Sequence, residues 1–264
     1  MTLFRTIPLR NTFKGKVIFA TDVHGQLGYL QKALSLMDYK DPVDGVPVDM
    51  IFGAGDMIDR GDESYLTAQK FRYDIDKFSI NGNHELLCLD EEEMTGDRLL
   101  VSQYTNGGEW REKVGKGVVK DLNNHYKEMP LAAEVIMPDG KKIGIVHATV
   151  PEGMHWDEMK AELTKPNPCR DLIRYLTWER KSVYRKDTYE VHGVDAVVCG
   201  HNVLDYGYQI IGNKVHIDTG ATFMCNGSDR NRLTLLEYKA GGPILGMFEP
   251  HEFVLNERGN IDYI

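Results

Sequence analysis

Asp56, Asp59 and Arg60 stand close together in the segment 55–61, which begins and ends with glycine. An apolar run at residues 48–52 precedes them and predicts a buried strand. Polar groups at the end of such a strand lie at the rim of an α/β sheet, where ligands bind. Two acids beside an arginine suit a metal ion that carries a phosphate group. Taken alone, the segment is equally explained by a strand-to-helix turn in which Asp59 caps the next helix.

A predicted strand at residues 16–20 leads to a second pair of candidate ligands, Asp22 and His24. In an extended chain, side chains two positions apart share a face, so we expect the carboxylate and the imidazole to point together. An oxygen beside an imidazole nitrogen makes half of a transition-metal site. Apolar residues at helical spacing between 27 and 37 complete a strand–turn–helix unit, in which the alternative role of Asp22 is that of a helix cap.

A third predicted strand, residues 77–80, is followed by Asn83 and His84. The amide oxygen of Asn83 suits a metal that already binds carboxylates, whereas His84 is expected to point elsewhere and to be free for proton transfer. Residues 86–89 read as the apolar start of a helix. We interpret the acidic residues 90–93 as a solvated face rather than a site.

Two lone histidines also follow predicted strands. Residues 142–146 end at His147, and residues 194–199 are followed by a glycine and His201. A lone histidine at a strand end is more often a hydrogen-bonded surface group than a ligand. Because these two strands are expected to lie in one sheet, and three other strands already present ligands, we favour metal binding for both.

Arg180 follows an aromatic residue and is a candidate second cation for phosphate, with Arg174 and Arg185 as nearby competitors and a plain surface charge as the alternative. Three further segments are assigned on pattern alone. Residues 106–110 have the composition of a turn, and residues 215–220 and 232–237 are predicted to be closing antiparallel strands.

The composition is that of a globular protein: 264 residues, 42% apolar, 27% charged, with a net charge of -9. The negative charge disfavours nucleic acid as a partner. No run reaches the roughly 18 apolar residues of a membrane span, so no membrane contact is expected. Four scattered cysteines without paired spacing indicate reduced, mostly buried thiols, and we therefore expect a cytoplasmic protein. The chain contains no Pro- or Ser-rich linker, which favours one large domain.

Together, five separated motifs resemble the signature of the calcineurin-like metallophosphoesterases. In chain order they are Asp22-x-His24, Gly55-Asp56-x-x-Asp59-Arg60-Gly61, Gly82-Asn83-His84-Glu85, His147 and Gly200-His201. Within that family the chain is most similar to the serine/threonine protein phosphatases of the bacteriophage lambda type, also through residues 106–110, 178–180 and 217–220. The similarity covers about residues 16–238.

The resemblance implies an α/β fold with two central mixed β-sheets flanked by helices, and a metal site at the C-terminal ends of the strands. We expect a single domain over residues 1–264, with a core at about 16–238, a short N-terminal extension and a C-terminal tail. The implied cofactors are two divalent metal ions, Mn²⁺ above all, with Fe or Zn as alternatives. The implied ligands are Asp22, His24 and Asp56 for the first ion, and Asp56 as a bridge with Asn83, His147 and His201 for the second.

The same resemblance implies direct hydrolysis of a phosphate monoester by a hydroxide that the two metal ions make available. Arg60 and Arg180 would bind the phosphate, and His84, held by Asp59, would be the general acid for the leaving group. The implied partner is a phosphoprotein or phosphopeptide, dephosphorylated on serine or threonine, with tyrosine as an alternative. The implied location is the cytoplasm, which is that of the host if the protein is encoded by a phage.

Departures from the family pattern leave the substrate open. Asn81 stands where the family usually has an arginine, Thr149 where relatives often carry an acid, and Asn202 where threonine is frequent. The main alternative is a symmetrical bis(5'-nucleosyl)-tetraphosphate hydrolase, which uses the same metal motifs. A phosphodiesterase or nuclease is disfavoured by the negative charge, and an inactive phosphate-sensing relative by the presence of all six ligands.

Overall fold

The computed structural model of the protein describes residues 3–241 and 243–264, and its strands form two six-stranded sheets. The first sheet has the order β1 (Phe4–Pro8), β5 (Ala132–Ile136), β6 (Lys142–Val146), β7 (Ala196–Cys199), β9 (Lys214–His216) and β8 (Gln209–Ile211). The second has the order β12 (Ile261–Tyr263), β11 (Phe248–Leu255), β10 (Leu233–Tyr238), β2 (Val17–Ala20), β3 (Met50–Gly53) and β4 (Lys77–Ser79). Parallel and antiparallel pairs occur in both sheets, which confirms the prediction of two mixed sheets.

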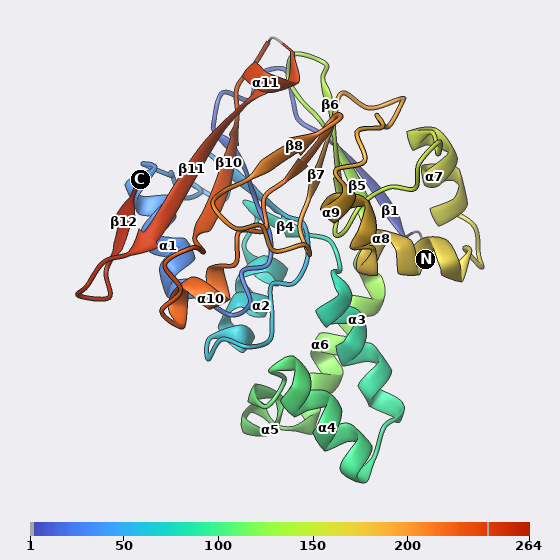
Figure 1. Ribbon diagram of the computed structural model, residues 1–264, viewed down its shortest axis with the longest axis vertical. Helices are drawn as coiled ribbons and strands as arrows, with labels where there is room; N and C mark the ends of the chain where they lie inside the picture. Colours follow the sequence, from blue (N-terminus) through green and yellow to red (C-terminus); the bar gives the residue numbers. More distant parts are fainter. Residues whose placement is uncertain (1–2, 242) are drawn as a thin grey trace.

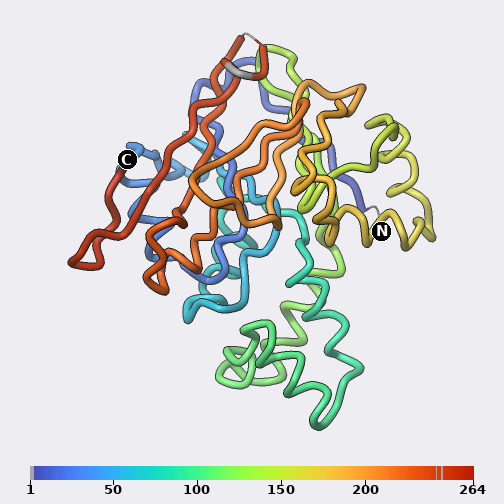
Figure 2. Tube along the Cα trace, in the orientation of Figure 1, coloured from blue at the N-terminus to red at the C-terminus, as the bar shows by residue number. Residues whose placement is uncertain are grey.

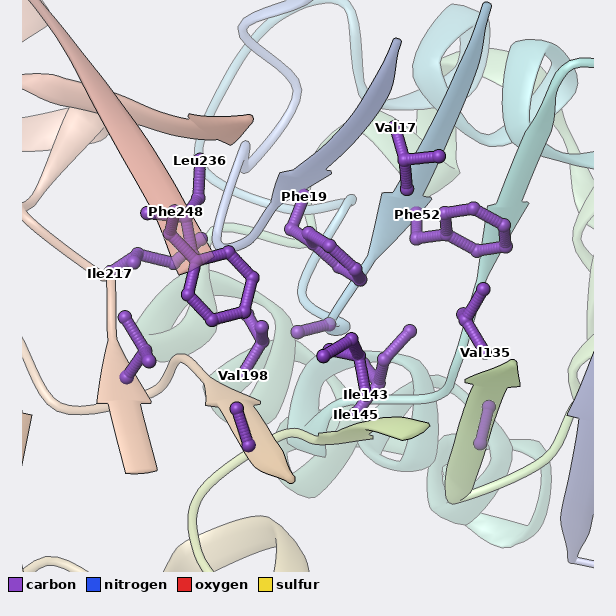
Figure 3. Close-up of a cluster of buried hydrophobic side chains, with 14 of the residues drawn as sticks. Val17, Phe19, Phe52, Val135, Ile143, Ile145, Val198, Ile217, Leu236 and Phe248 are labelled. Atoms are coloured by element: carbon purple, nitrogen blue, oxygen red, sulfur yellow. The ribbon is translucent and has the colours of Figure 1, made fainter. Parts of the chain in front are cut away.

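The two sheets pack face to face, and both faces of the central strands are buried. In β2, Val17 and Phe19 join the apolar cluster between the sheets, whereas Ile18 and Ala20 face a second cluster on the outer side. Figure 3 shows the inner cluster, in which Phe19 and its neighbours meet side chains of the first sheet such as Ile145. Burial on both faces explains why these strands read as continuous apolar runs.

Helices cover the outer face of each sheet and complete four layers (Figure 1). The second sheet is covered by α1 (Leu27–Leu36), α2 (Ser64–Tyr73) and α10 (Ala221–Cys225). The first sheet is covered by α7 (Trp156–Leu163) and α8 (Arg170–Trp178), after which comes the short α9 (Lys181–Arg185). The predicted strands at 16–20, 48–52, 77–80, 142–146, 194–199 and 232–237 and the predicted helix at 27–37 agree with the observed bounds to within a few residues.

One helical segment stands away from the sheets and is drawn in green in Figure 1. It consists of α3 (Asn83–Asp90), a 3₁₀ turn (Glu91–Glu93), α4 (Gly96–Asn106), α5 (Trp110–Val114) and α6 (Lys116–Glu128). The segment has its own apolar cluster, in which Trp110 and Leu122 pack against Ile58 from the loop that follows β3. The helical segment is therefore attached to the end of β3 by packing as well as by the chain.

Strands outside residues 16–238 complete the edges of the sheets. The chain ends lie on opposite sides of the molecule (Figure 2), because β1 borders the first sheet and β12 the second. The residues after 240 run through the short α11 (Ile244–Met247) into β11 and β12. That the whole chain is a single domain stays a prediction. Among the described residues, none of the helices is long and apolar enough to cross a membrane.

Two local predictions are wrong. The strand expected at 215–220 is only β9, which ends at His216 and runs parallel to β7, so that it is antiparallel to β8 alone. The acidic run 90–93 is not a uniformly solvated face, because Glu91 is buried beside Arg111, with 3.3 Å between its Oε2 and the guanidinium Nη1. From a run of like charges one can expect that most of its residues are exposed. The run does not show that one of them pairs with a residue far along the chain, as Glu91 does with Arg111.

Candidate metal centre

The buried carboxylate of Asp56 lies at the centre of a group of imidazoles. Its Oδ2 is 3.3 Å from Nε2 of His147, 3.9 Å from Nε2 of His24 and 3.8 Å from Nε2 of His84. Two sets of side chains could hold a metal ion, His24–Asp56–His84 and Asp56–His147–His201, with ligand atoms within 4.8 Å of one another in each set. Asp56 belongs to both sets, which is the arrangement that a shared carboxylate between two ions requires.

Residues from both sheets contribute to this centre. The segments that follow β2, β3 and β4 in the second sheet supply Asp22, His24, Asp56, Asn83 and His84. The segments that follow β6 and β7 in the first sheet supply His147 and His201. The sequence predicted one sheet edge for all of them. The site lies instead where the C-terminal ends of strands from two stacked sheets meet. The two histidines do come from strands of one sheet, as predicted, and these strands are parallel neighbours.

Strained backbone shapes the loops of the centre. Asp22 and His24 both have a φ of 48°, and Asp56, Asp59, Arg60 and His201 also lie in the left-handed region. Such conformations cost free energy in non-glycine residues and persist only where the surroundings enforce them. The expectation that Asp22 and His24 share the face of an extended strand was wrong, since β2 ends at Ala20. They approach one another through two left-handed residues instead.

Two glycines permit the close approach of these loops. A Cβ on Gly82 would lie 2.2 Å from Oδ1 of Asp56, and a Cβ on Gly200 would lie 2.2 Å from Oδ2 of Asp22. The same two carboxylates accept backbone hydrogen bonds from the following residues, His84 N at 2.9 Å and His201 N at 2.9 Å. The glycines in the motifs therefore bring backbone N–H groups onto the carboxylates.

Hydrogen bonds to backbone carbonyls orient the imidazoles. Nδ1 of His24 lies 2.9 Å from the carbonyl of Ile58, and Nδ1 of His147 lies 2.8 Å from the carbonyl of Ala54. With the proton on Nδ1, each ring presents the Nε2 lone pair to Asp56, which is the second-shell pattern of metal-binding histidines. Nε2 of His201 is buried and has no hydrogen-bond partner among the described residues. These donors fit a divalent metal ion.

The titration of the three rings follows from burial and from the nearby charges. Burial lowers the pKa of His24 to about 3, helped by the charges of His84 and Arg60, and burial lowers the pKa of His201 to about 2. Both rings are therefore neutral, as metal binding requires. Burial also opposes a charge on His147, but Asp56 and other carboxylate interactions outweigh it and raise the pKa to about 10. The negative charge of the neighbouring carboxylates thus favours the protonated form of His147.

Asn83 and His84 are the first two residues of α3, so their side chains diverge as the sequence predicted. Oδ1 of Asn83 lies 2.9 Å from Nε2 of His147, on the side of the second set of ligands. Nε2 of His84 lies on the other side, where its ring is 4.7 Å from that of His24. All six side chains proposed as metal ligands thus meet in one buried centre.

His84 belongs to a second hydrogen-bonded group, centred on Asp59. Nδ1 of His84 lies 2.8 Å from Oδ2 of Asp59, while Oδ1 of Asp59 accepts hydrogen bonds from Trp110 Nε1 at 2.8 Å and Arg111 Nη2 at 2.8 Å. Burial opposes ionisation of Asp59, but Arg111 and the bond to His84 outweigh it and lower its pKa. For His84, burial is outweighed by Asp56 and by the bond to Asp59, which raise its pKa. The pair favours a protonated imidazole.

Two exposed arginines border the centre. The guanidinium of Arg60 lies between two rings, with Nη1 2.8 Å from Nε2 of His24 and Nη2 3.2 Å from Nε2 of His84. Nη1 of Arg180 donates to the carbonyl of His201 at 3.1 Å. Nδ2 of Asn202 donates to the carbonyl of Glu179 at 3.0 Å, which ties the segment that carries Arg180 to the loop after β7.

Several residues that organise the centre had no predicted role. Arg111 carried no signal at all, and Trp110 was noted only as part of a predicted turn and of the family resemblance. Glu85 was quoted within its motif, yet its carboxylate accepts backbone hydrogen bonds from Asp56, Met57 and Gly82 at 2.8–2.9 Å and so joins the loops after β3 and β4.

Asn81, one of the departures from the family pattern, is buried and is hydrogen-bonded to the helical segment. Its Nδ2 donates to the carbonyl of Tyr126 at 2.8 Å. Asn81 therefore ties the end of β4 to the last turns of α6 rather than serving as a ligand of the centre.

Comparisons with known proteins agree with this geometry. Residues 15–205 match the family described as calcineurin-like phosphoesterase. Serine/threonine-protein phosphatase 2 of Salmonella typhimurium is 25% identical over 231 residues, which cover 86% of this chain and 97% of that protein.

Solved structures show the same fold. A protein serine/threonine phosphatase from Saccharomyces cerevisiae, with similarity to human phosphatase PP5, aligns with a TM-score of 0.66 at 16% identity, covering 99% of this chain and 87% of that one. A putative diadenosine tetraphosphatase aligns with a TM-score of 0.57 at 17% identity, covering 98% and 97%. With the family match over most of its length, and with two buried His/Asp groups that share a carboxylate, the chain belongs to the calcineurin-like phosphoesterases.

Proposed function

We propose that the protein is a phosphoprotein phosphatase that hydrolyses phosphoserine and phosphothreonine, and to a lesser extent phosphotyrosine. As a metallophosphoesterase it is a hydrolase of phosphoesters. The observation that carries the proposal is the single carboxylate of Asp56, which lies within metal-binding distance of His24 on one side and of His147 and His201 on the other. The relatives named as serine/threonine phosphatases support the finer assignment, since one of them is matched over nearly its whole length.

We assign Asp22, His24 and Asp56 to one divalent ion, and Asp56, Asn83, His147 and His201 to a second, with Mn²⁺ as the ion that this mixture of carboxylate, amide and imidazole favours. When bound, two such ions act as Lewis acids toward the phosphate and make water nucleophilic near neutral pH. The chain contributes the orientation of the ligands. Backbone carbonyls fix the rings of His24 and His147, and Glu85 fixes the loops.

Arg60 and Arg180 are the proposed phosphate-binding cations, and both are exposed at the border of the centre. A guanidinium pairs with two phosphate oxygens at once and balances the charge that develops on them. The short distance from Arg60 to His24 and His84 places this cation on the side of the proposed general acid.

His84 is the proposed general acid. The alkoxide of serine or threonine is a poor leaving group, so its oxygen must take a proton as the bond to phosphorus breaks. Nδ1 of His84 is engaged with Asp59 at 2.8 Å, which leaves Nε2 to deliver that proton. Asp59 keeps the ring in the required orientation and favours its protonated form, which is the task of an orienting carboxylate.

The proposal is tested with metal-stripped protein reloaded with one metal at a time. Each form is assayed on phosphoserine, phosphothreonine and phosphotyrosine peptides and on diadenosine tetraphosphate. We expect Mn²⁺ to restore the highest kcat/KM, and phosphoserine or phosphothreonine peptides to be the best substrates. A higher kcat/KM for the dinucleotide than for every phosphopeptide would instead support the symmetrical tetraphosphate hydrolase, to which the fold is also similar.

A further inference from the structure

A groove of about 890 Å³ opens beside the metal centre, between α3 and α8. Asn83 and Arg180, both assigned above to the centre, lie in its wall, so the groove is continuous with the proposed phosphate site. Figure 1 shows α8 near the upper end of α3, at the point where the helical segment leaves the sheets. The part of a substrate that extends from a bound phosphate group can therefore lie in this groove.

The α8 wall of this groove, called here the α3–α8 groove, is rich in cations. Arg170, Arg174, Arg180 and Lys181 all line it, all are exposed, and none forms an ion pair within the part of the chain that the structure describes. Arg170 and Arg174 are four residues apart in α8, so they lie on one face of the helix. On a protein with a net charge of -9, unpaired cations gathered on one face mark a site for a negatively charged partner.

Acidic residues also line the groove but do not cancel these cations. Asp90, Asp171 and Glu179 lie in the wall. The carboxylate of Glu179 is already occupied, since its Oε1 accepts hydrogen bonds from the backbone N–H groups of Lys181 at 2.6 Å and Ser182 at 3.2 Å. With four cationic and three acidic side chains in its lining, the groove keeps a small excess of positive charge.

The α3 wall is apolar. Leu86, Leu87 and Leu89 are half-buried there, opposite α8, and Trp178 at the end of α8 is 41% exposed. A polyphosphate chain finds no complementary group on leucine side chains, whereas a polypeptide offers both apolar and acidic side chains. The mixture of an apolar wall and a cationic wall thus favours a peptide over an extended polyphosphate.

We propose that the α3–α8 groove binds the segment that flanks the phosphorylated residue, and that it selects acidic side chains on one side of the phosphate. The inference rests on the proposed phosphoprotein phosphatase function and adds to it a preference among phosphopeptides. Arg174 and Arg170 lie about 6 and about 12 Å from the end of α8 along the helix axis, at ~1.5 Å per residue. At ~3.3 Å per residue of extended chain, they face positions about two and about four residues from the phosphorylated residue.

The test compares kcat/KM for matched phosphopeptides. One series carries glutamate two and four residues before the phosphoserine, a second carries it two and four residues after, and neutral and lysine-containing versions serve as references. We expect one acidic series, and only one, to exceed its neutral reference by about tenfold, as two exposed ion pairs allow. The excess should shrink when the salt concentration rises from low to 0.5 M, because the cations are exposed.

The variant Arg174→Glu is expected to remove most of the acidic preference and to raise kcat/KM for the lysine-containing peptide relative to the neutral one. Arg258→Glu, a charge reversal at an exposed arginine in the turn between β11 and β12, should leave the ratio of acidic to neutral peptide unchanged. Equal kcat/KM for acidic and neutral peptides, or an equal effect of both variants on the ratio, would overturn the groove inference while leaving the phosphatase proposal intact. Hydrolysis of p-nitrophenyl phosphate without hydrolysis of any phosphopeptide would overturn both.

Discussion

Replacing Arg111 by methionine isolates the group that supports the proposed general acid. Arg111 is 3% exposed and donates to both oxygens of Asp59, at 2.8 and 3.0 Å, and Asp59 is fully buried. Removing one member of such a pair leaves a buried charge without its partner and costs about 3–5 kcal/mol of unfolding free energy. An ordinary domain has about 5–15 kcal/mol, so we expect a folded protein with a clearly lower urea midpoint.

The catalytic effect of Arg111→Met follows from the pKa of Asp59. Burial alone raises that pKa, and Arg111 is the largest of the interactions that oppose burial. Without Arg111, the pKa of Asp59 rises and the carboxylate favours the protonated form of His84 less strongly. A positioned general acid contributes about 10²–10⁴ to the rate, and since His84 stays in place we expect a loss of about 10–100-fold on a serine phosphate. The metal content should not change.

The assay that separates this effect from general damage uses two leaving groups. Kinetics are compared on a phosphoserine peptide and on p-nitrophenyl phosphate, whose phenolate leaves without much help from an acid. The loss should be far smaller on the phenolic substrate. Arg72→Met, which removes an exposed ion pair with Asp121, is the control and should affect neither substrate. An equal loss on both substrates, or no loss on the peptide, would refute the coupling of Arg111 to proton donation.

Three further substitutions test neighbouring parts of the same reasoning. His84→Asn should reduce kcat on the phosphoserine peptide by ~10²–10⁴ and leave the metal content nearly unchanged, and an equal reduction on p-nitrophenyl phosphate would show that His84 is not the acid. His201→Ala should lower the number of bound ions measured by mass spectrometry, because the buried Nε2 of His201 has no protein partner among the described residues. His192→Ala, at an exposed histidine, is the control. An unchanged number of ions, or the same loss in the control, would count against His201 as a ligand. In Gly108→Ala the new Cβ would lie 1.7 Å from Nη1 of Arg111 and must displace the guanidinium. We therefore expect the same result as for Arg111→Met, a larger loss of rate on the phosphoserine peptide than on p-nitrophenyl phosphate. Wild-type rates on both substrates would mean that Arg111 accommodates the methyl group.

The sequence revealed the candidate ligands because each follows an apolar run. Asp22, Asp56 and Asn83 come just after β2, β3 and β4, and such positions at strand ends are recognisable without coordinates. Which strands share a sheet could not be predicted in the same way. The pairing of β6 with β7 and of β2 with β3 leaves no trace in the residues of either strand. The presence of two sheets therefore came only from the family resemblance, and the division of the site between them was not predicted.

The residues that hold Asp59 beside His84 could not be predicted, for a more specific reason. Asp59 contacts Trp110 and Arg111, which are 51 and 52 residues away in the chain, and neither has a neighbour that suggests a partner. Glu91 was misread for the same reason. It faces Arg111 from the other side, and nothing in four consecutive acidic residues distinguishes the buried one from the three others. A local sequence pattern identifies side chains that could bind a ligand. It does not identify the distant residues that position those side chains.

Asp56 and Asp59 are three residues apart and yet belong to different parts of the molecule. Asp56 is held among imidazoles from both sheets, so its environment depends on the packing of one sheet against the other. Asp59 is held by Trp110 and Arg111 in the helical segment, whose apolar cluster meets the sheets through Ile58, the residue before it. A change within the helical segment should therefore act on proton donation to the leaving group before it acts on metal binding. Changes in the cluster between the sheets should act on both.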